Sequence, residues 1–358
     1  MKKTIAIFPA SINNDNPYQS LIELCLKKAG FKVIKIPSRK FFPFLQLLNK
    51  NIDAVHMNWP HDFYIGKNII SGSIKRIMFL LSLFILKKMK IVYSADNLIS
   101  HNKNTNVEFE KKWINMIIKR ADGIICSSEN AKNIFCKFFS YQETEKIKVI
   151  PHPSYQSLYK HTISKSHARK KLNFNDSRPI LVAIGFIKSY KGYEQILSTI
   201  SGLGNLKGTF IIAGRCQNKN LLDNLKRKIK LNQSGIKIIL INRFLDNDEV
   251  QIYLNAADGT IFNYTDTPMN PGSLILAMGF GLNIIGPFKG AIPEIVPPDA
   301  LFGFHPGDEE GIKKQLECFY TSNFLDASGL KCKEKIHNDH SISVIAKHYK
   351  NLYLDILK

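Results

Sequence analysis

Short apolar runs rich in β-branched residues alternate along the chain with longer segments whose apolar positions recur at helical spacing. This alternation predicts an α/β protein in which parallel sheets are covered by helices on both faces. In the first half, we expect strands at Thr4–Phe8, Lys32–Ile36, Ala54–Met57, Lys90–Ser94, Gly123–Cys126 and Lys148–Ile150. In the second half, we expect them at Ile180–Ile184, Thr209–Ala213, Lys237–Ile241, Gly259–Phe262 and Asn283–Gly286.

The segments between these runs have the periodicity of amphipathic helices. In the first half, the expected helices are Pro17–Ala29, Lys67–Lys88, Asn106–Arg120 and Glu129–Phe138. In the second half, they are Tyr193–Ile200, Leu221–Leu231, Asp248–Ala256 and Ser273–Gly279. Ligands of such sheets bind beyond the carboxyl ends of the strands, so the loops after the strands are where we expect functional residues.

The apolar periodicity is interrupted once, between Gln156 and Arg178, where the chain becomes polar and basic. We interpret this stretch as the connection between two domains, residues 1–158 and 178–338, which agrees with a length of 358 residues. Residues 341–358 space Ile345, Tyr349 and Leu352 at helical intervals. They predict a C-terminal helix that packs back on the N-terminal domain.

The most apolar run, Ile77–Leu86, is flanked by basic residues at positions 75, 76, 87, 88 and 90. At about ten residues the run is much shorter than the roughly 20 that a membrane-spanning helix needs. Two interpretations remain open. A helix of this kind can lie in a membrane interface with its cations on anionic headgroups, or it can be buried in the protein.

Charge adds one constraint. With 50 Lys and Arg against 29 Asp and Glu, the net charge is +21, which attracts phosphates, anionic lipids or nucleic acid. A general bias toward Lys, Asn and Ile gives the same charge without any polyanion site. The six cysteines have no paired short spacing, and the apolar run at the N-terminus stops at Pro9. We therefore expect a reducing, cytoplasmic environment.

The loop Gly185–Gly192 carries the most informative motif. A strand ends at Gly185, Lys188 and Lys191 follow, and a glycine then admits a helix. Backbone amides and ammonium groups in this arrangement can converge on a diphosphate. A basic surface turn is the alternative interpretation.

A second candidate for anion binding follows the strand at Gly259–Phe262. Asn270 is a suitable N-cap, Pro271 fits the first helical position, and the amides of Gly272 and Ser273 would then be available to a phosphate. Asp266 lies in the same loop. A capped structural helix explains the same residues equally well.

In the first half, polar groups follow two strands. His56, Trp59, His61 and Asp62 follow the strand at Ala54–Met57, and the next strand leads into Asp96 and His101. Sugars are bound by aromatic stacking with polar groups, and proton transfer needs a His or Asp near the hydroxyl. We interpret Trp59, His61 and His101 as acceptor-binding residues. An ordinary strand exit is the alternative.

In their order and spacing, these segments resemble the GT-B glycosyltransferases typified by glycosyltransferase family four, in particular bacterial surface-polysaccharide transferases. The resemblance spans nearly the whole chain. The segments that carry it are His56–Pro60, Ala121–Ser128, Val149–His152, Gly185–Gly192, Ile212–Gly214, Ala277–Leu282 and Gly290–Glu294.

The resemblance implies a GT-B fold, in which two doubly wound Rossmann-like domains face a central cleft. It implies that the C-terminal domain binds the nucleotide-sugar donor and the N-terminal domain the acceptor. Lys191 matches the lysine that binds the donor diphosphate. Phe186 stands where relatives usually have arginine, so Lys188 is expected to supply the second positive charge.

The chain also departs from the family pattern. The two glutamates that relatives place around the nucleotide-binding helix correspond to Pro268 and Leu276. We expect Asp266 and the amides of Gly272 and Ser273 to take over part of their role. An inverting enzyme needs a base, for which His56, Asp62 and Asp96 are candidates. A retaining one needs none, and the sequence does not choose between them.

The expected function is transfer of a hexose-type sugar from a nucleotide-diphosphate sugar to a glycan acceptor, lipid-linked through a polyprenol, in surface-polysaccharide biosynthesis. We expect the protein in the cytoplasm, peripheral at the inner leaflet of the plasma membrane. No metal or other cofactor and no nucleic-acid partner is expected. The alternatives are a catalytically inactive GT-B partner of an active transferase and, from charge alone, a nucleic-acid-binding protein.

Overall fold

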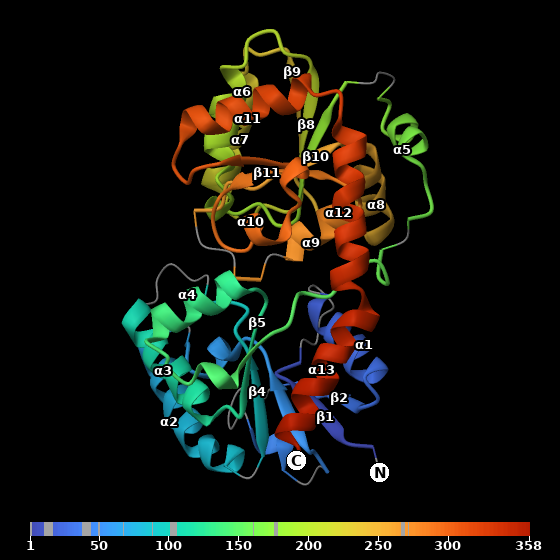
Figure 1. The fold of residues 1–358 in the computed structure, drawn as a ribbon. Helices are drawn as coiled ribbons and strands as arrows, with labels where there is room; N and C mark the ends of the chain where they lie inside the picture. Colours follow the sequence, from blue (N-terminus) through green and yellow to red (C-terminus); the bar gives the residue numbers. More distant parts are fainter. Residues whose placement is uncertain are drawn as a thin grey trace. The chain divides into compact units, whose positions relative to one another are not determined.

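The computed structural model describes residues 2–10, 17–37, 44–48, 51–66, 68–87, 89–100, 106–159, 161–174, 178–265, 269–270 and 272–358. The chain divides into two compact units. The first combines Met1–Pro153 with Asp339–Lys358, and the second is Ser154–Asn338. Both contain a parallel sheet with helices packed on it (Figure 1).

The sheet of the first unit has six strands in the order β2-β1-β3-β4-β5-β6, and every pairing between neighbours is parallel. From β1 the chain winds first to one side, to β2, and then to the other, beginning with β3. The strands are β1 (Thr4–Phe8), β2 (Lys32–Lys35), β3 (Ala54–Met57), β4 (Lys90–Ser94), β5 (Gly123–Cys126) and β6 (Ile147–Val149).

The helices of the first unit include one from the far end of the chain. α13 (Ile342–Ile356) packs against α1 (Tyr18–Lys28) (Figure 1). Tyr349 and Tyr353 of α13 are fully buried in the same apolar cluster as Ile22 of α1. The other helices of this unit are α2 (Ile69–Leu86), α3 (Val107–Arg120), α4 (Glu129–Phe139) and three short 3₁₀ turns, Leu45–Leu47, Pro60–Phe63 and Thr144–Lys146.

The second sheet also has six parallel strands, in the order β12-β11-β10-β7-β8-β9. The order reverses between β7 and β10, which makes this junction the topological switch point. The strands are β7 (Ile180–Ile184), β8 (Gly208–Ala213), β9 (Ile236–Ile241), β10 (Gly259–Ile261), β11 (Asn283–Pro287) and β12 (Leu301–Phe304).

The helices of the second unit flank this sheet. Its apolar core is built from buried side chains of β7 and β8 together with those of α6 and α11. The helices are α5 (Lys165–Lys171), α6 (Tyr193–Ser201), α7 (Lys219–Lys230), α8 (Asn247–Ala256), α9 (Gly272–Gly279), α10 (Ile292–Ile295), α11 (Glu309–Thr321) and α12 (Leu325–His340), with 3₁₀ turns at Ser189–Lys191 and Pro298–Ala300.

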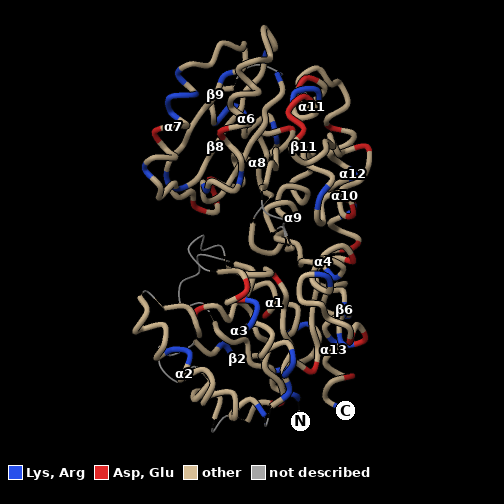
Figure 2. The backbone as a smooth tube through the Cα atoms, turned by 90° about the vertical axis from the view of Figure 1, so that its left-hand side faces the viewer, with Lys and Arg blue, Asp and Glu red and all other residues tan. Residues whose placement is uncertain are grey.

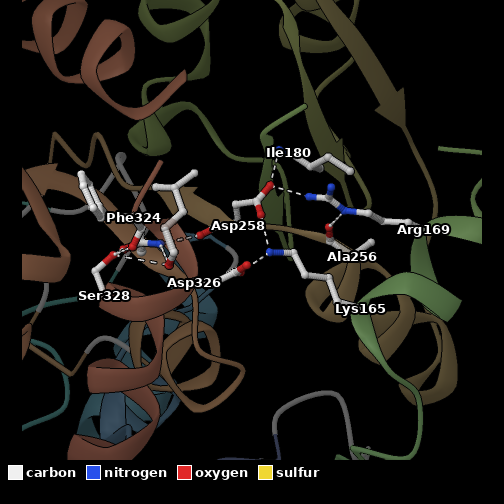
Figure 3. Close-up of polar contacts among 10 residues, drawn as sticks. Lys165, Arg169, Ile180, Ala256, Asp258, Phe324, Asp326 and Ser328 are labelled. Carbon is white, nitrogen blue, oxygen red and sulfur yellow. Dashed lines mark hydrogen bonds and ion pairs between the residues drawn. The ribbon is translucent and has the colours of Figure 1, made fainter. Parts of the chain in front are cut away.

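The stretch interpreted as a connection is anchored to the second unit. α5 lies within it and packs against α8. The buried carboxylate of Asp258 accepts hydrogen bonds from Nη2 of Arg169 at 2.7 Å and from the backbone amide of Ile180 at 2.6 Å, and it lies 2.5 Å from Nζ of Lys165 (Figure 3). The end of the connection is therefore held at the start of the second sheet.

The prediction of two doubly wound Rossmann-like domains is confirmed. Predicted strands such as Thr4–Phe8 and Ile180–Ile184 coincide with the observed ones, and most other boundaries differ by one or two residues. The elements that were not predicted include α5, α10, α11, α12 and β12. β12 is a short edge strand that follows a Pro-rich turn. α5 has a mostly charged sequence, and its Lys165 and Arg169 contact the buried carboxylate of Asp258.

Candidate functional site

A small cavity lies at the carboxyl ends of β7 and β10, at the switch point of the second sheet. Its volume of about 20 Å³ leaves room for roughly one water molecule. A whole nucleotide would therefore need space outside it. The lining residues are Ala183, Ile184, Lys191, Tyr193, Leu254, Thr260, Ile261, Phe262, Tyr264, Ser273, Leu276 and Ala277.

The loop from Gly185 to Gly192 leads the chain past this cavity. Gly185 and Gly192 have positive φ angles of 104° and 68°, which side chains other than glycine adopt only with strain. A Cβ atom at Gly192 would also lie 2.4 Å from the carbonyl oxygen of Asn263. Glycines therefore allow the loop to turn tightly and α6 to start beside the next loop of the site.

Lys191 is the charged residue that lines the cavity. Its side chain is buried, with 8% of the residue exposed, and Nζ lies 6.0 Å from the ring centroid of Tyr193. Burial, reinforced by the nearby charge of Lys188, lowers the pKa of Lys191 to about 8. A buried ammonium group with a depressed pKa gains most from an anionic ligand. Lys188 is exposed.

The hydroxyl groups of Tyr264 and Ser273 lie 3.1 Å apart and also line the cavity. Burial raises the pKa of Tyr264, so this phenol stays protonated. The amide of Gly272 donates a hydrogen bond to the carbonyl oxygen of Asn270 at 2.9 Å. We had expected this amide to be available to an anion, and the structure instead gives it a partner within the chain.

Of the other residues discussed for this loop, some lie outside the described part of the chain and one lines the cavity. Asp266, Pro268 and Pro271 lie outside the described residues. Leu276 is described and lines the cavity with an apolar side chain. Leu276, which corresponds to the second glutamate of the family pattern, therefore offers no hydrogen bond to a ligand.

Two further cations follow strands of this sheet and were not among the predicted residues. Arg215 comes directly after Gly214, and its carbonyl oxygen accepts a hydrogen bond from the amide of Ile187 at 3.0 Å. Lys289 follows β11, and its Nζ donates to the carbonyl oxygen of Thr265 at 3.1 Å. Their position after a strand was the signal that could have identified them.

In the first unit, His56 is held inside the protein. Its Nδ1 lies 2.8 Å from the hydroxyl of Tyr353, and its Nε2 lies 3.0 Å from Oγ of Ser94. The residue has no exposed surface, and burial lowers its pKa to about 3. With both ring nitrogens engaged, this arrangement supports a structural role for His56 and gives no support to the predicted role as a base.

Asp96 and Asn58 meet at the carboxyl ends of β4 and β3. Nδ2 of Asn58 donates to Oδ2 of Asp96 at 2.9 Å, and both residues are buried. Oδ1 of Asn58 has no hydrogen-bonding partner among the described residues. The pair joins two strand ends and leaves Oδ1 of Asn58 as an unused acceptor.

His61 lies in a second polar cluster of the first unit. Its Nδ1 lies 2.8 Å from the hydroxyl of Tyr64 and 3.4 Å from Oε2 of Glu110. Glu110 of α3 has no exposed surface and accepts a hydrogen bond from the amide of Ser100 at 2.8 Å. Glu110 was missed because a carboxylate inside a helical segment has the sequence pattern of an ordinary solvent-exposed position.

The other predicted acceptor-side residues have different surroundings. Trp59 adopts a left-handed backbone with φ of 44°, and its ring centroid is 5.8 Å from that of Tyr18. The side chain of Asp62 is exposed. His101 lies outside the described residues. His61 and Trp59 are thus close in sequence and partly exposed on the same turn.

No group of three or more His, Cys, Asp or Glu side chains that could hold a metal ion occurs within the described parts of the chain. The charged group of the second-unit cavity is an ammonium. The arrangement can thus stabilise negative charge on a ligand electrostatically, while the first unit presents His61 and Trp59 as partly exposed ring systems.

The chain matches no protein-family model and no curated protein sequence. Solved structures resemble it over its whole length. A glycosyltransferase from Rickettsia africae is 16% identical, with a TM-score of 0.72 over 100% of this chain and 99% of that one. Sucrose-phosphate synthase from Thermosynechococcus elongatus is 15% identical, with a TM-score of 0.73 over 99% of both chains.

HepE from Anabaena, solved in complex with UDP and glucose, is 13% identical, with a TM-score of 0.72 over 99% of this chain and 100% of that one. Identities this low establish a common fold only. Together with the two parallel six-stranded sheets, the similarity shows that this chain has the GT-B fold.

Proposed function

We propose that this protein is a glycosyltransferase that moves a hexose-type sugar from a nucleotide-diphosphate sugar to a glycan acceptor. The observation that carries the proposal is the buried ammonium group of Lys191 at the switch point of the second sheet. The switch point is where sheets of this kind bind nucleotides. HepE, which shares the fold, has been solved with UDP and with UDP-glucose.

Lys191 and Lys188 would neutralise the charge that develops on the departing diphosphate. A cation already fixed in a dry site stabilises that charge without reorganisation of solvent, which is why such groups lower reaction barriers. Tyr264 and Ser273 would contribute hydroxyl groups beside the ammonium. In this proposal the chain uses no metal ion and no other cofactor.

The acceptor side of the proposal lies in the first unit. Trp59 would stack on a sugar ring, His61 would bind its hydroxyls, and Asp96 would serve as base if the reaction inverts configuration. We propose a lipid-linked glycan as acceptor, in surface-polysaccharide synthesis at the cytoplasmic face of the plasma membrane. WaaG, described as a glycosyltransferase involved in lipopolysaccharide biosynthesis, has a similar structure with a TM-score of 0.63 at 11% identity.

Lys191→Ala and the more nearly isosteric Lys191→Met test the donor site. Each should lower transfer from the preferred nucleotide sugar by about 100-fold or more, in the range measured for loss of one charge-stabilising group. Lys219→Ala, which removes an exposed lysine of α7 in the same unit, is the matched control and should retain activity. Transfer at the wild-type rate by both Lys191 variants would refute the proposal.

Two observations favour a second candidate, a catalytically inactive partner of an active transferase. The cavity presents Leu276 where relatives have a glutamate, and the amide of Gly272 is already engaged. A panel of nucleotide sugars, assayed for binding by calorimetry and for turnover by release of nucleotide, distinguishes the two. Binding without turnover on any acceptor would favour the inactive partner.

His61→Ala tests the acceptor side separately. It should reduce transfer to the acceptor by about 10-fold or more and leave donor binding to the second unit unchanged. His348→Ala, at an exposed position of α13 in the same unit, serves as control. Equal loss of donor binding and transfer in the His61 variant would contradict its assignment to the acceptor.

A further inference from the structure

Helix α2 exposes a continuous stripe of large apolar side chains. Ile70, Ile74, Ile77, Leu81 and Phe84 follow one another at intervals of four and three residues, which places them along one face of the helix. Their exposed fractions are 74%, 40%, 55%, 51% and 65%. A contiguous exposed apolar face of this kind marks an interaction site.

The opposite face of α2 is firmly packed. Gly72, Phe79 and Leu86 are buried, and the ring of Phe79 contacts those of Phe44 and Trp113 at centroid distances of 5.9 and 5.7 Å. The helix is therefore part of the first unit, and its exposed stripe points away from that unit. Among the described residues, it is the one helix long and apolar enough to cross a membrane, but crossing would require Phe79 to leave this core.

The charges on α2 are all positive. Lys75 and Arg76 lie within the helix, Lys87 is its C-cap, and no acidic residue occurs between Asn68 and Lys87. In Figure 2, Lys and Arg are blue and Asp and Glu red, and α2 carries no red segment. Nζ of Lys87 lies 4.6 Å from the ring centroid of Phe84, at one end of the apolar stripe. The ammonium group of Lys87 thus lies beside Phe84 at the C-terminal end of the stripe.

We propose that α2 docks the protein on an anionic lipid bilayer, with the helix axis parallel to the membrane surface. The stripe enters the boundary between headgroups and acyl chains, and Lys87 meets the anionic headgroups. Arg76 instead lies over the ring of Phe109 of α3, and Nζ of Lys75 donates to the carbonyl oxygens of Asp62 and Ile65. A second copy of this chain fits less well, because two α2 helices packed on their stripes would offer Lys87 no acidic side chain of α2 as a partner.

A membrane-bound α2 would place the protein at the bilayer that holds the lipid-linked acceptor of the proposed function. Nucleotide-sugar binding in the second unit does not depend on it. The two proposals therefore fail separately: loss of vesicle binding leaves donor binding intact, and a protein that binds no nucleotide sugar can still bind vesicles.

Co-sedimentation with vesicles tests the docking surface, using phosphatidylcholine alone and phosphatidylcholine mixed with phosphatidylglycerol. The full chain should bind the mixed vesicles, and binding should weaken as salt screens the headgroup charge. Ile77→Gln combined with Leu81→Gln should lower the partition coefficient by about tenfold or more. Leu231→Gln, which changes a side chain with 65% exposure in the second unit, should not.

Three further measurements make the outcome decisive. Urea unfolding checks that the variants fold, and light scattering after size exclusion reports self-association. A dimer that the double substitution dissociates would assign the stripe to a second copy and overturn the proposal. If the natural protein is extracted from membranes by detergent but not by alkaline carbonate, the proposal is overturned in favour of a spanning helix. If the wild type and the double variant bind vesicles equally, another surface of the protein binds the membrane.

Discussion

Nδ1 of His56 lies 2.8 Å from the hydroxyl of Tyr353, 297 positions further along the chain. Both side chains are fully buried. The contact joins β3 to α13, so the last helix of the chain completes the core of the first unit. Removal of α13 would leave His56 and a row of apolar side chains uncovered.

Tyr353→Phe should lower the free energy of unfolding of the first unit by about 1 kcal/mol or somewhat more, because it deletes one buried hydrogen bond and leaves Nδ1 of His56 without its partner. Urea denaturation measures this loss. Tyr141→Phe is a matched control, since the hydroxyl of Tyr141 is buried with no hydrogen-bonding partner among the described residues. That change should be neutral or stabilising, and an equal loss in both variants would contradict the assignment.

Stability should fall in mild acid. Burial lowers the pKa of both His56 and His152 to about 3, while an unfolded histidine titrates near its ordinary value of about 6.5. The unfolded state therefore binds more protons between these values. The stabilising effect is complete above about pH 6.5 and is lost as the pH falls toward 3, by up to about 1.4 kcal/mol per pH unit for each histidine.

Urea midpoints measured across this acidic range test that expectation. His56→Gln should be less stable at neutral pH and should show a weaker dependence on pH. His348→Gln, at an exposed position of α13, should keep the slope of the wild type. A wild-type slope in the His56 variant would show that this histidine does not titrate as its burial requires.

Donor affinity should depend on pH through Lys191. Because the pKa of this lysine is lowered to about 8, its ammonium group is present below that value and is lost above it. Affinity for a nucleoside diphosphate should therefore be steady below about pH 8 and fall by up to about tenfold per pH unit above it. Calorimetric titration on either side of pH 8 measures the effect.

Lys191→Arg provides the comparison, because arginine stays charged over the whole range. If it still binds, its affinity should be nearly independent of pH. An identical fall in affinity in the arginine variant would assign the pH dependence to another group.

Asp258 should be a major stabilising residue of the second unit. Asp258→Ala leaves Arg169 and the amide of Ile180 without their acceptor in a buried site (Figure 3). Breaking a buried charge pair in this way costs about 3–5 kcal/mol. Asp299→Ala removes the exposed partner of Lys331 and should cost at most about 1 kcal/mol. Thermal unfolding of the two variants tests the contrast, and equal melting temperatures would contradict it.

The predicted features that agree with the structure are local ones. The strand at Thr4–Phe8 and the helix starting at Tyr193 follow from periodicity and from the glycines around them, which act within a few residues. The position of Lys191 after β7 followed from the same reasoning. β12 was missed, because a short strand at the edge of a sheet has no long apolar run of its own.

By itself, the sequence determined the order of strands and helices, the α/β class and the loop that carries Lys191. Tertiary structure decided the rest: that His56 is neutral and enclosed, that Glu110 of α3 meets His61, and that the apolar stripe of α2 stays uncovered. The physical reason is that periodicity records which positions are apolar. Whether such a face is covered, and which charge meets which, depends on packing between segments far apart in the chain.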